Sequence, residues 1–238
     1  MTIEIVVGSL QDLNDACARQ FEEAAASAVR ERGRFAVALP GGSVATTFFP
    51  RLARARVDGS RTDFFWVDER AVPPSDPESN YGVAERLWLT PGRVAAERVH
   101  RMPADTSDLE SAADSYAEEL SPLLGDPPRL DVALLGMGPD GHVGSLFPGH
   151  PLLREERRWV AAILDSPKPP PRRLTLTLPV LHAADLLIVA AMGEAKAEVV
   201  RRAIEDSTSA LPVALALRGA RRALFLLDRP AASRLSRS

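Results

Sequence analysis

Short apolar or β-branched runs alternate along this chain with longer segments whose apolar residues recur at helical spacing. The short runs indicate buried strands, and the longer amphipathic segments indicate helices. The predicted strands cover residues 3–7, 35–39, 63–67, 130–135, 159–163, 174–177, 186–190 and 223–227. The predicted helices cover residues 10–32, 44–55, 81–89, 109–124 and 194–204.

Alternating strands and helices are typical of a parallel sheet covered on both faces. We therefore expect an α/β fold, a doubly wound and mostly parallel sheet flanked by helices in the Rossmann-like manner. The length of 238 residues and a hydrophobic content of 45 % allow a substantial core, and we expect one domain over residues 1–238. The proline-rich segment 166–171 predicts a stiff loop that is too short to link domains.

The composition indicates which partners and which cellular compartment to expect. The net charge of −3 provides no overall attraction for nucleic acid or an anionic membrane, so neither is an expected partner. Because Cys17 is the single cysteine, the chain has no intrachain disulfide. We expect Cys17 to lie in a helix and to be buried in the protein core. The amino-terminal residues show no secretory pattern, and no apolar run reaches the roughly 20 residues that span a bilayer. These features favour a cytoplasmic protein.

The most informative motif is the glycine-rich stretch 136–148, which directly follows the predicted strand 130–135. Glycines let the backbone lie close to a ligand, and open α/β sheets bind ligands at the carboxyl ends of their strands. This turn carries Asp140 and His142. It is therefore the first place to expect chemistry.

Three roles are open for His142 when the turn is considered alone. An imidazole with an ordinary pKa near 6.5 serves as a general base at neutral pH, and Asp140 is close enough in sequence to orient it. A structural histidine that hydrogen-bonds the turn is the second reading. A metal site using His150 as a further ligand is the third, although the spacing matches no compact zinc pattern. Ser145 lacks the Gly-x-Ser-x-Gly elbow of a serine hydrolase, so we expect it to bind ligand or cap a helix.

Three other loops follow predicted strands and are expected at the same sheet edge. Gly41, Gly42 and Ser43 precede a predicted helix, with Ser43 suited to its N-cap and backbone amides available to a phosphate. An ordinary strand-to-helix turn is the alternative reading. 

The segment Asp68-Glu69-Arg70 places an arginine fork just past an apolar strand. Arg70 suits phosphate oxygens, while its acidic neighbours suit sugar hydroxyls or the arginine itself; a surface ion cluster is the alternative. Lys196 stands in the first turn of a predicted helix, and only it and Lys168 are lysines among 29 basic residues. A solvated helix lysine is the alternative reading there.

The ordered set of motifs resembles the 6-phosphogluconolactonase family within the glucosamine-6-phosphate isomerase superfamily, over nearly the whole chain. The markers are Gly136-Met-Gly-Pro-Asp-Gly-His142 with Ser145-Leu-Phe-Pro148, Asp68-Glu-Arg70, Ser79-Asn80-Tyr81, Ser166-Pro-Lys-Pro-Pro170 with Arg173-Leu-Thr-Leu-Thr177, and Gly193-Glu-Ala-Lys196. The resemblance implies that the chain hydrolyses 6-phospho-D-glucono-1,5-lactone in the oxidative pentose phosphate pathway.

Residue roles follow from the same resemblance. His142 would activate water with Asp140 beside it, and Arg70, Lys196 and Arg173 would contact the phosphate or carbonyl. The loop of Gly41, Gly42 and Ser43 would complete the phosphate pocket. From the residues themselves we also expect Asp68 and Ser145 to contact the substrate. No cofactor or metal is implied, the partner is a small sugar phosphate lactone, and we expect a monomer or a weak homodimer.

Two alternative functions remain open for this chain. An isomerase or deaminase of amino sugar phosphates typically has an aromatic residue after Asp-Glu and a Phe-Asn-Glu-Pro continuation after the histidine. Here these positions hold Arg70 and residues 145–148, Ser-Leu-Phe-Pro. A sugar-phosphate sensor of a transcription regulator normally adds a helix-turn-helix segment, and only two residues precede the first predicted strand.

Overall fold

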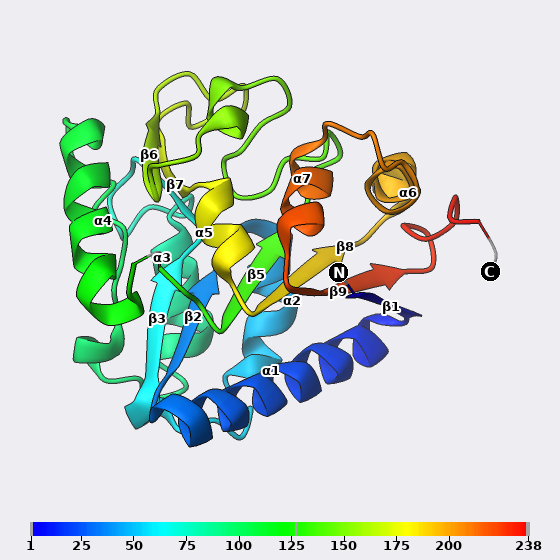
Figure 1. The fold of residues 1–238 in the computed structure, drawn as a ribbon. Coiled ribbons are helices and arrows are strands. Elements are labelled where there is room, and N and C mark those ends of the chain that lie inside the picture. Colours follow the sequence, from blue (N-terminus) through cyan, green and yellow to red (C-terminus); the bar gives the residue numbers. More distant parts are fainter. Residues whose placement is uncertain (1, 127, 237–238) are drawn as a thin grey trace.

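Nine strands form two sheets in the computed structural model, which describes residues 2–126 and 128–236 (Figure 1). The large sheet is parallel and has the order β1 (Thr2–Gly8), β9 (Arg222–Asp228), β8 (Leu186–Ala191), β5 (Val132–Gly136), β2 (Phe35–Leu39), β3 (Thr62–Trp66). The small sheet is antiparallel, with the order β4 (Asp68–Arg70), β7 (Arg173–Leu176), β6 (Val160–Ile163).

Helices cover both faces of the large sheet. They are α1 (Leu10–Arg32), α2 (Gly42–Leu52), α3 (Asn80–Ala84), α4 (Leu109–Leu124), α5 (Leu178–Ala183), α6 (Ala197–Glu205) and α7 (Pro212–Gly219). Helices α1 and α2 pack together on one side, and α5, α6 and α7 lie on the other (Figure 1). The predicted α/β fold with a mostly parallel, helix-flanked sheet is confirmed. None of the described helices is long and apolar enough to cross a membrane.

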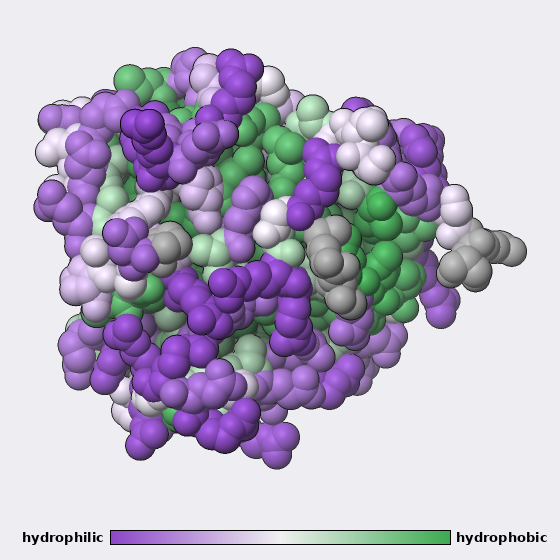
Figure 2. All heavy atoms as spheres, in the orientation of Figure 1, coloured by the Kyte–Doolittle hydropathy of each residue, from purple (hydrophilic) through white to green (hydrophobic). Residues whose placement is uncertain are grey.

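Local chemistry explains the bounds of the longest helix, α1. Ser9 and Asp12 form a reciprocal capping box at its start, and Gly33 ends it in the left-handed conformation with φ 77°. Its inner face buries Cys17, whose thiol pKa burial raises to about 12, as expected of a core cysteine. Polar side chains dominate the surface over α1 in the space-filling view (Figure 2). The amphipathic pattern therefore predicts this helix well.

The structure differs from the sequence prediction in the second sheet. The predicted strands 159–163 and 174–177 exist as β6 and β7, but they pair with each other and with β4 outside the large sheet. A short buried run shows the same hydrophobic pattern in either sheet, so periodicity does not separate the two cases. Helix α7 was not predicted, and the predicted helix 81–89 is α3 continued by a π-helical turn over Glu85–Leu89.

The strand order places a topological switch between β2 and β5. The chain proceeds outward from β2 to the edge strand β3, and it later returns to β5 on the other side of β2. Loops leaving the carboxyl ends of two such strands turn to opposite faces and leave a crevice between them. The loops after β2 and β5 are the two glycine-rich motifs.

Candidate active site

A cavity of about 240 Å³ opens at this crevice. The loops that follow β2, β5 and β8 contribute to its wall, together with β4 and β7 of the small sheet. The lining residues are Pro40, Gly41, Gly42, Ser43, Val44, Asp68, Arg70, Gly136, Met137, Gly138, Pro139, His142, Gly144, Arg173 and Lys196. The structure thus brings together eight of the ten predicted site residues in one cavity wall; Asp140 and Ser145 stand directly behind it.

His142 is carried by a tight turn after β5. The Gly138 N–H donates to the His142 carbonyl at 3.0 Å, and the Gly141 N–H donates to the Gly138 carbonyl at 3.0 Å. Gly141 has φ 85°, a conformation that glycine adopts at little cost. A side chain on Gly138 would place its Cβ 2.1 Å from the imidazole. Glycine at position 138 is therefore required for the ring to fold back over its own turn.

Asp140 orients the imidazole. Its Oδ1 lies 2.5 Å from His142 Nδ1. An ionised carboxylate only accepts hydrogen bonds, so Nδ1 carries the proton and donates, leaving Nε2 as the basic nitrogen. The ring of Phe147 packs against the imidazole with centroids 5.0 Å apart. The orientation of the ring is thus set by one hydrogen bond and one aromatic contact.

The charges around this pair favour a neutral imidazole beside an ionised carboxylate. Burial lowers the pKa of His142 below its ordinary value, the Asp140 carboxylate opposes that shift, and the Lys168 ammonium adds to it. Burial alone would raise the pKa of Asp140, but its contacts with His142 and Lys168 lower it overall. A neutral imidazole with a free nitrogen in a cavity is the form that a general base requires.

Asp68 lines the cavity and belongs to a buried polar cluster that extends behind it. The Ser145 hydroxyl donates to Asp68 Oδ2 at 2.6 Å, and Arg173 Nη1 lies 3.4 Å from the same hydroxyl. Ser145 is fully buried, caps no helix and does not line the cavity, so it is linked to the cavity through Asp68 and Arg173. Arg173 lines the cavity, yet its other N–H groups donate to the carbonyls of residues 168–170.

Glu69 holds the backbone rather than facing the cavity. Its carboxylate accepts from the backbone N–H groups of Arg70, Asn80 and Tyr81 at 2.7–2.8 Å and from the Ser79 hydroxyl at 3.1 Å. Burial raises its pKa despite these donors. Glu69 therefore ties β4 to the start of α3.

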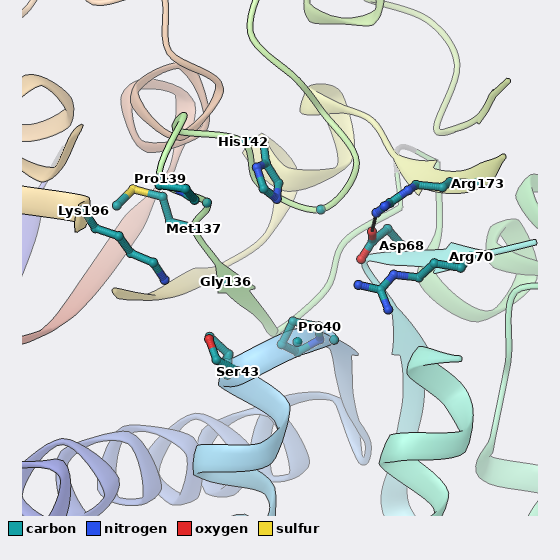
Figure 3. Close-up of a pocket in the computed structure, with 15 residues that line it drawn as sticks. Pro40, Ser43, Asp68, Arg70, Gly136, Met137, Pro139, His142, Arg173 and Lys196 are labelled. Carbon is teal, nitrogen blue, oxygen red and sulfur yellow. Dashed lines mark ion pairs between the residues drawn. The ribbon is translucent and has the colours of Figure 1, made fainter. Parts of the chain in front are cut away.

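Two cations reach the cavity from opposite sides. In Figure 3 the Lys196 side chain enters across from that of Arg70, with His142 on a third side between them. Arg70 Nη1 donates to the Glu78 carbonyl at 2.6 Å, which holds the guanidinium in place. Burial lowers the pKa of Lys196, with Asp228 opposing that shift. This arrangement suits a small anionic ligand held at the cavity floor.

The loop after β2 is a close fit against its neighbours. Gly42 has φ 64°, and a Cβ on Gly41 would lie 1.7 Å from Asn80 Oδ1. The prediction that Ser43 is the N-cap is wrong: α2 begins at Gly42 with Gly41 as its N-cap and no side-chain cap, because two glycines let the helix start earlier. The amino-terminal end of α2 and the Ser43 side chain lie at the cavity (Figure 3). The first-turn amides of a helix have no partner within the helix and are available to an anion.

Two residues at the site were not singled out from the sequence. Lys168 Nζ lies 3.1 Å from His142 Nδ1, and Asn80 Nδ2 donates to the Asp68 carbonyl at 2.8 Å. Both stand within motifs that support the family resemblance, and Lys168 is one of only two lysines, which was the available signal. Within residues 2–126 and 128–236, no three His, Cys, Asp or Glu side chains converge closely enough to hold a metal ion.

Comparison with known proteins assigns the family. The model of glucosamine-6-phosphate isomerases/6-phosphogluconolactonase matches residues 8–225, which include all residues that line the cavity. The chain belongs to this family. The match confirms the resemblance inferred from the motifs.

Curated relatives and solved structures point to one branch of the family. The chain is 42 % identical over 240 residues to 6-phosphogluconolactonase of Rattus norvegicus, covering 97 % of this chain and 93 % of the relative. It is 42 % identical over 220 residues to 6-phosphogluconolactonase of Streptomyces coelicolor, covering 87 % and 84 %. The solved 6-phosphogluconolactonase of Trypanosoma brucei superposes with a TM-score of 0.87 at 29 % identity, over 99 % of both chains.

Proposed function

We propose that this protein is a 6-phosphogluconolactonase that hydrolyses 6-phospho-D-glucono-1,5-lactone to 6-phosphogluconate. The observation that carries the proposal is the His142 imidazole, held by Asp140 at 2.5 Å with Nε2 free, in a cavity that also receives Arg70 and Lys196. The names of the relatives support the same substrate.

In the proposed reaction, His142 acts as the general base. Nε2 removes a proton from water as its oxygen bonds to the lactone carbonyl carbon, giving a tetrahedral oxyanion and an imidazolium that Asp140 stabilises. The oxyanion then collapses, the ring C–O bond breaks, and the departing ring oxygen takes the proton from the imidazolium. The products are a carboxylic acid, which ionises, and a free hydroxyl, so the histidine is regenerated.

The phosphate serves as a handle for the reacting end of the substrate. Arg70, Lys196 and the amides of residues 41–43 supply positive charge and donors for it, and fixing one end of the substrate orients the other. Arg173 is the remaining cation at the wall and stays a predicted carbonyl or phosphate contact. The proposed chemistry needs no cofactor, because a lactone is an activated ester.

The isomerase and sensor alternatives receive less support. Positions 143–148 hold no glutamate to serve an isomerase, and Leu146 and Phe147 among them are buried. A sensor needs a pocket for the sugar phosphate but does not need an oriented general base. The hydrogen bond from His142 Nδ1 to Asp140 orients the imidazole as a general base requires.

The test is lactone hydrolysis measured in the full-length protein. The lactone is generated enzymatically, and its loss is followed for wild type, His142→Ala and a matched control, His182→Ala, which removes a histidine whose Nε2 instead contacts the Leu215 carbonyl between α5 and α7. Loss of a general base is expected to reduce kcat by roughly 10²–10⁴-fold in His142→Ala only. A folded wild type that does not accelerate hydrolysis contradicts the proposal. Consumption of glucosamine 6-phosphate would indicate the isomerase or deaminase, and binding without consumption a sensor.

A further inference from the structure

Lys168 contacts both members of the catalytic pair, although it comes from a different part of the fold. It lies in the loop between β6 and β7 of the small sheet, whereas His142 and Asp140 follow β5 of the large sheet. Its Nζ is 3.2 Å from Asp140 Oδ1 and 3.1 Å from His142 Nδ1. One carboxylate oxygen is thus shared between an imidazole N–H and an ammonium.

The loop holds this ammonium in place through its backbone. The Ser166 hydroxyl donates to the Lys168 carbonyl at 2.8 Å and accepts from the Lys168 N–H at 3.2 Å. Arg173 donates from Nη2 to the carbonyls of Lys168 and Pro169 at 3.0 Å, and from Nε to that of Pro170 at 2.9 Å. Most N–H donors of the buried Arg173 side chain therefore hold the segment that carries Lys168.

A compact ammonium suits this position better than the arginine that the chain uses elsewhere. Of 29 basic residues only two are lysines, and both are at this site. A guanidinium is a planar fork that spreads its charge, whereas an ammonium is a point charge that fits beside a single oxygen. With Nδ1 already donating to Asp140, Lys168 does not bond to the imidazole but acts on it through charge.

The charged groups that face His142 come from three elements. Asp140 is on its own turn, Asp68 is on β4, and Lys168 is on the loop between β6 and β7; the first two favour a protonated imidazole and Lys168 opposes it. Asp140 alone would orient the ring but also make it more basic, which leaves less of the neutral form at neutral pH. A cation on the same carboxylate oxygen keeps the orientation and offsets the charge.

We propose that Lys168 is a positioning residue that holds Asp140 against Nδ1 and neutralises its charge, so that His142 stays unprotonated at Nε2. The kinetic part of this inference rests on the proposed lactonase function. The effect on the imidazole itself does not, and it is measurable without turnover.

The first measurement is an NMR titration of the histidine ring protons in the full-length protein. The chain has four histidines, and a His142→Gln variant assigns the signal of interest. Lys168→Met, which removes the charge but retains most of the side-chain length, is expected to raise the pKa of His142 by about 1 unit. Lys168→Arg retains the charge and is expected to leave that pKa near its wild-type value. A Lys168→Met protein whose His142 titrates within about 0.3 unit of wild type overturns the proposal.

The second measurement is the pH dependence of kcat/KM for lactone hydrolysis. In Lys168→Met the acid limb is expected to move upward with the imidazole pKa, and kcat to fall while KM changes little, because the phosphate contacts remain. Lys196→Met is the matched control: it is expected to raise KM and leave the titration of His142 in place. A raised KM with an unmoved acid limb in Lys168→Met would make Lys168 a substrate contact and overturn the positioning role. If wild type does not consume lactone, the proposed function fails, and the NMR titration still decides the role of Lys168.

Discussion

Replacing Gly41 by alanine tests how closely the loop after β2 is fitted to its surroundings. The new Cβ would lie 1.7 Å from Asn80 Oδ1, 2.3 Å from Cγ and 2.9 Å from Nδ2, all within van der Waals radii. Asn80 is 1 % exposed, and its Nδ2 donates to the carbonyl and the carboxylate of Asp68 at 2.8 and 3.2 Å. The side chain therefore has to leave both hydrogen bonds, or the loop has to move.

The expected cost follows from these contacts. Two buried hydrogen bonds contribute about 1 kcal/mol each, and accommodating an extra carbon in a packed site adds about 1–2 kcal/mol of strain. Gly41→Ala should thus lower the free energy of unfolding by about 3–4 kcal/mol. The displaced loop should also raise KM for the lactone, because Gly41, Gly42 and Ser43 line the cavity.

Urea denaturation of the full chain measures this cost, with two variants as controls. Gly42→Ala is the same substitution one residue later, but a Cβ there would have no atom within 4 Å. Only the φ of 64° is unfavourable for alanine, so the free energy of unfolding should fall by about 1 kcal/mol. The double variant Gly41→Ala/Asn80→Ala should be less destabilised than the sum of its singles, because the clash is gone. Equal stability of Gly41→Ala and Gly42→Ala, or strict additivity in the double variant, would refute the reasoning.

Two further predictions concern the histidines. Gly138→Ala places a Cβ 2.1 Å from the His142 ring and 2.5 Å from Asp140 Oδ1, so kcat should fall by roughly 10²-fold while circular dichroism stays native; an unchanged kcat would contradict the arrangement of the turn. Although burial opposes it, contacts with Asp63 and Glu119 raise the pKa of His100 above 6.5. The stability that His100 contributes is therefore complete below 6.5 and is lost as pH rises through its higher folded pKa. His100→Gln should be more destabilising at about pH 5.5 than at about pH 9, as thermal unfolding at the two values will show, and an equal effect would count against the ion pairs.

The sequence predicted the parts of the fold that have a strong local signal. Helix 109–124 was predicted with its observed bounds, and the predicted β-branched and apolar runs of the parallel sheet agree with the observed strands to within two residues at each end. Separation of β6 and β7 into a second sheet depends on pairing with β4, three residues that carry charge rather than apolar side chains. Such a strand is stabilised by its partner, so the residues alone do not reveal it.

Site residues that directly follow predicted strands could be predicted from the sequence. Contacts between residues distant in the sequence could not. Arg70, His142 and Lys196 could be placed at one sheet edge because parallel strands end together. The burial of Ser145 behind Asp68 and the reach of Lys168 to Asp140 are contacts between residues 77 and 28 positions apart. No local pattern encodes these contacts, and only its scarcity and its place in the Ser166–Pro170 motif drew attention to Lys168.

The pairing of β1 with β9 has a consequence for how the chain assembles during synthesis. Thr2 is opposite Arg222 in that register, so β1 finds its neighbour only after some two hundred further residues have been synthesised. Contacts this distant in sequence close late, because a long loop must be ordered first. Meanwhile Lys196, the last cavity residue, is already translated. A nascent chain stalled shortly before β9 would therefore carry every cavity residue on an unfinished sheet, and the onset of the proposed lactonase activity during translation would report the addition of β9.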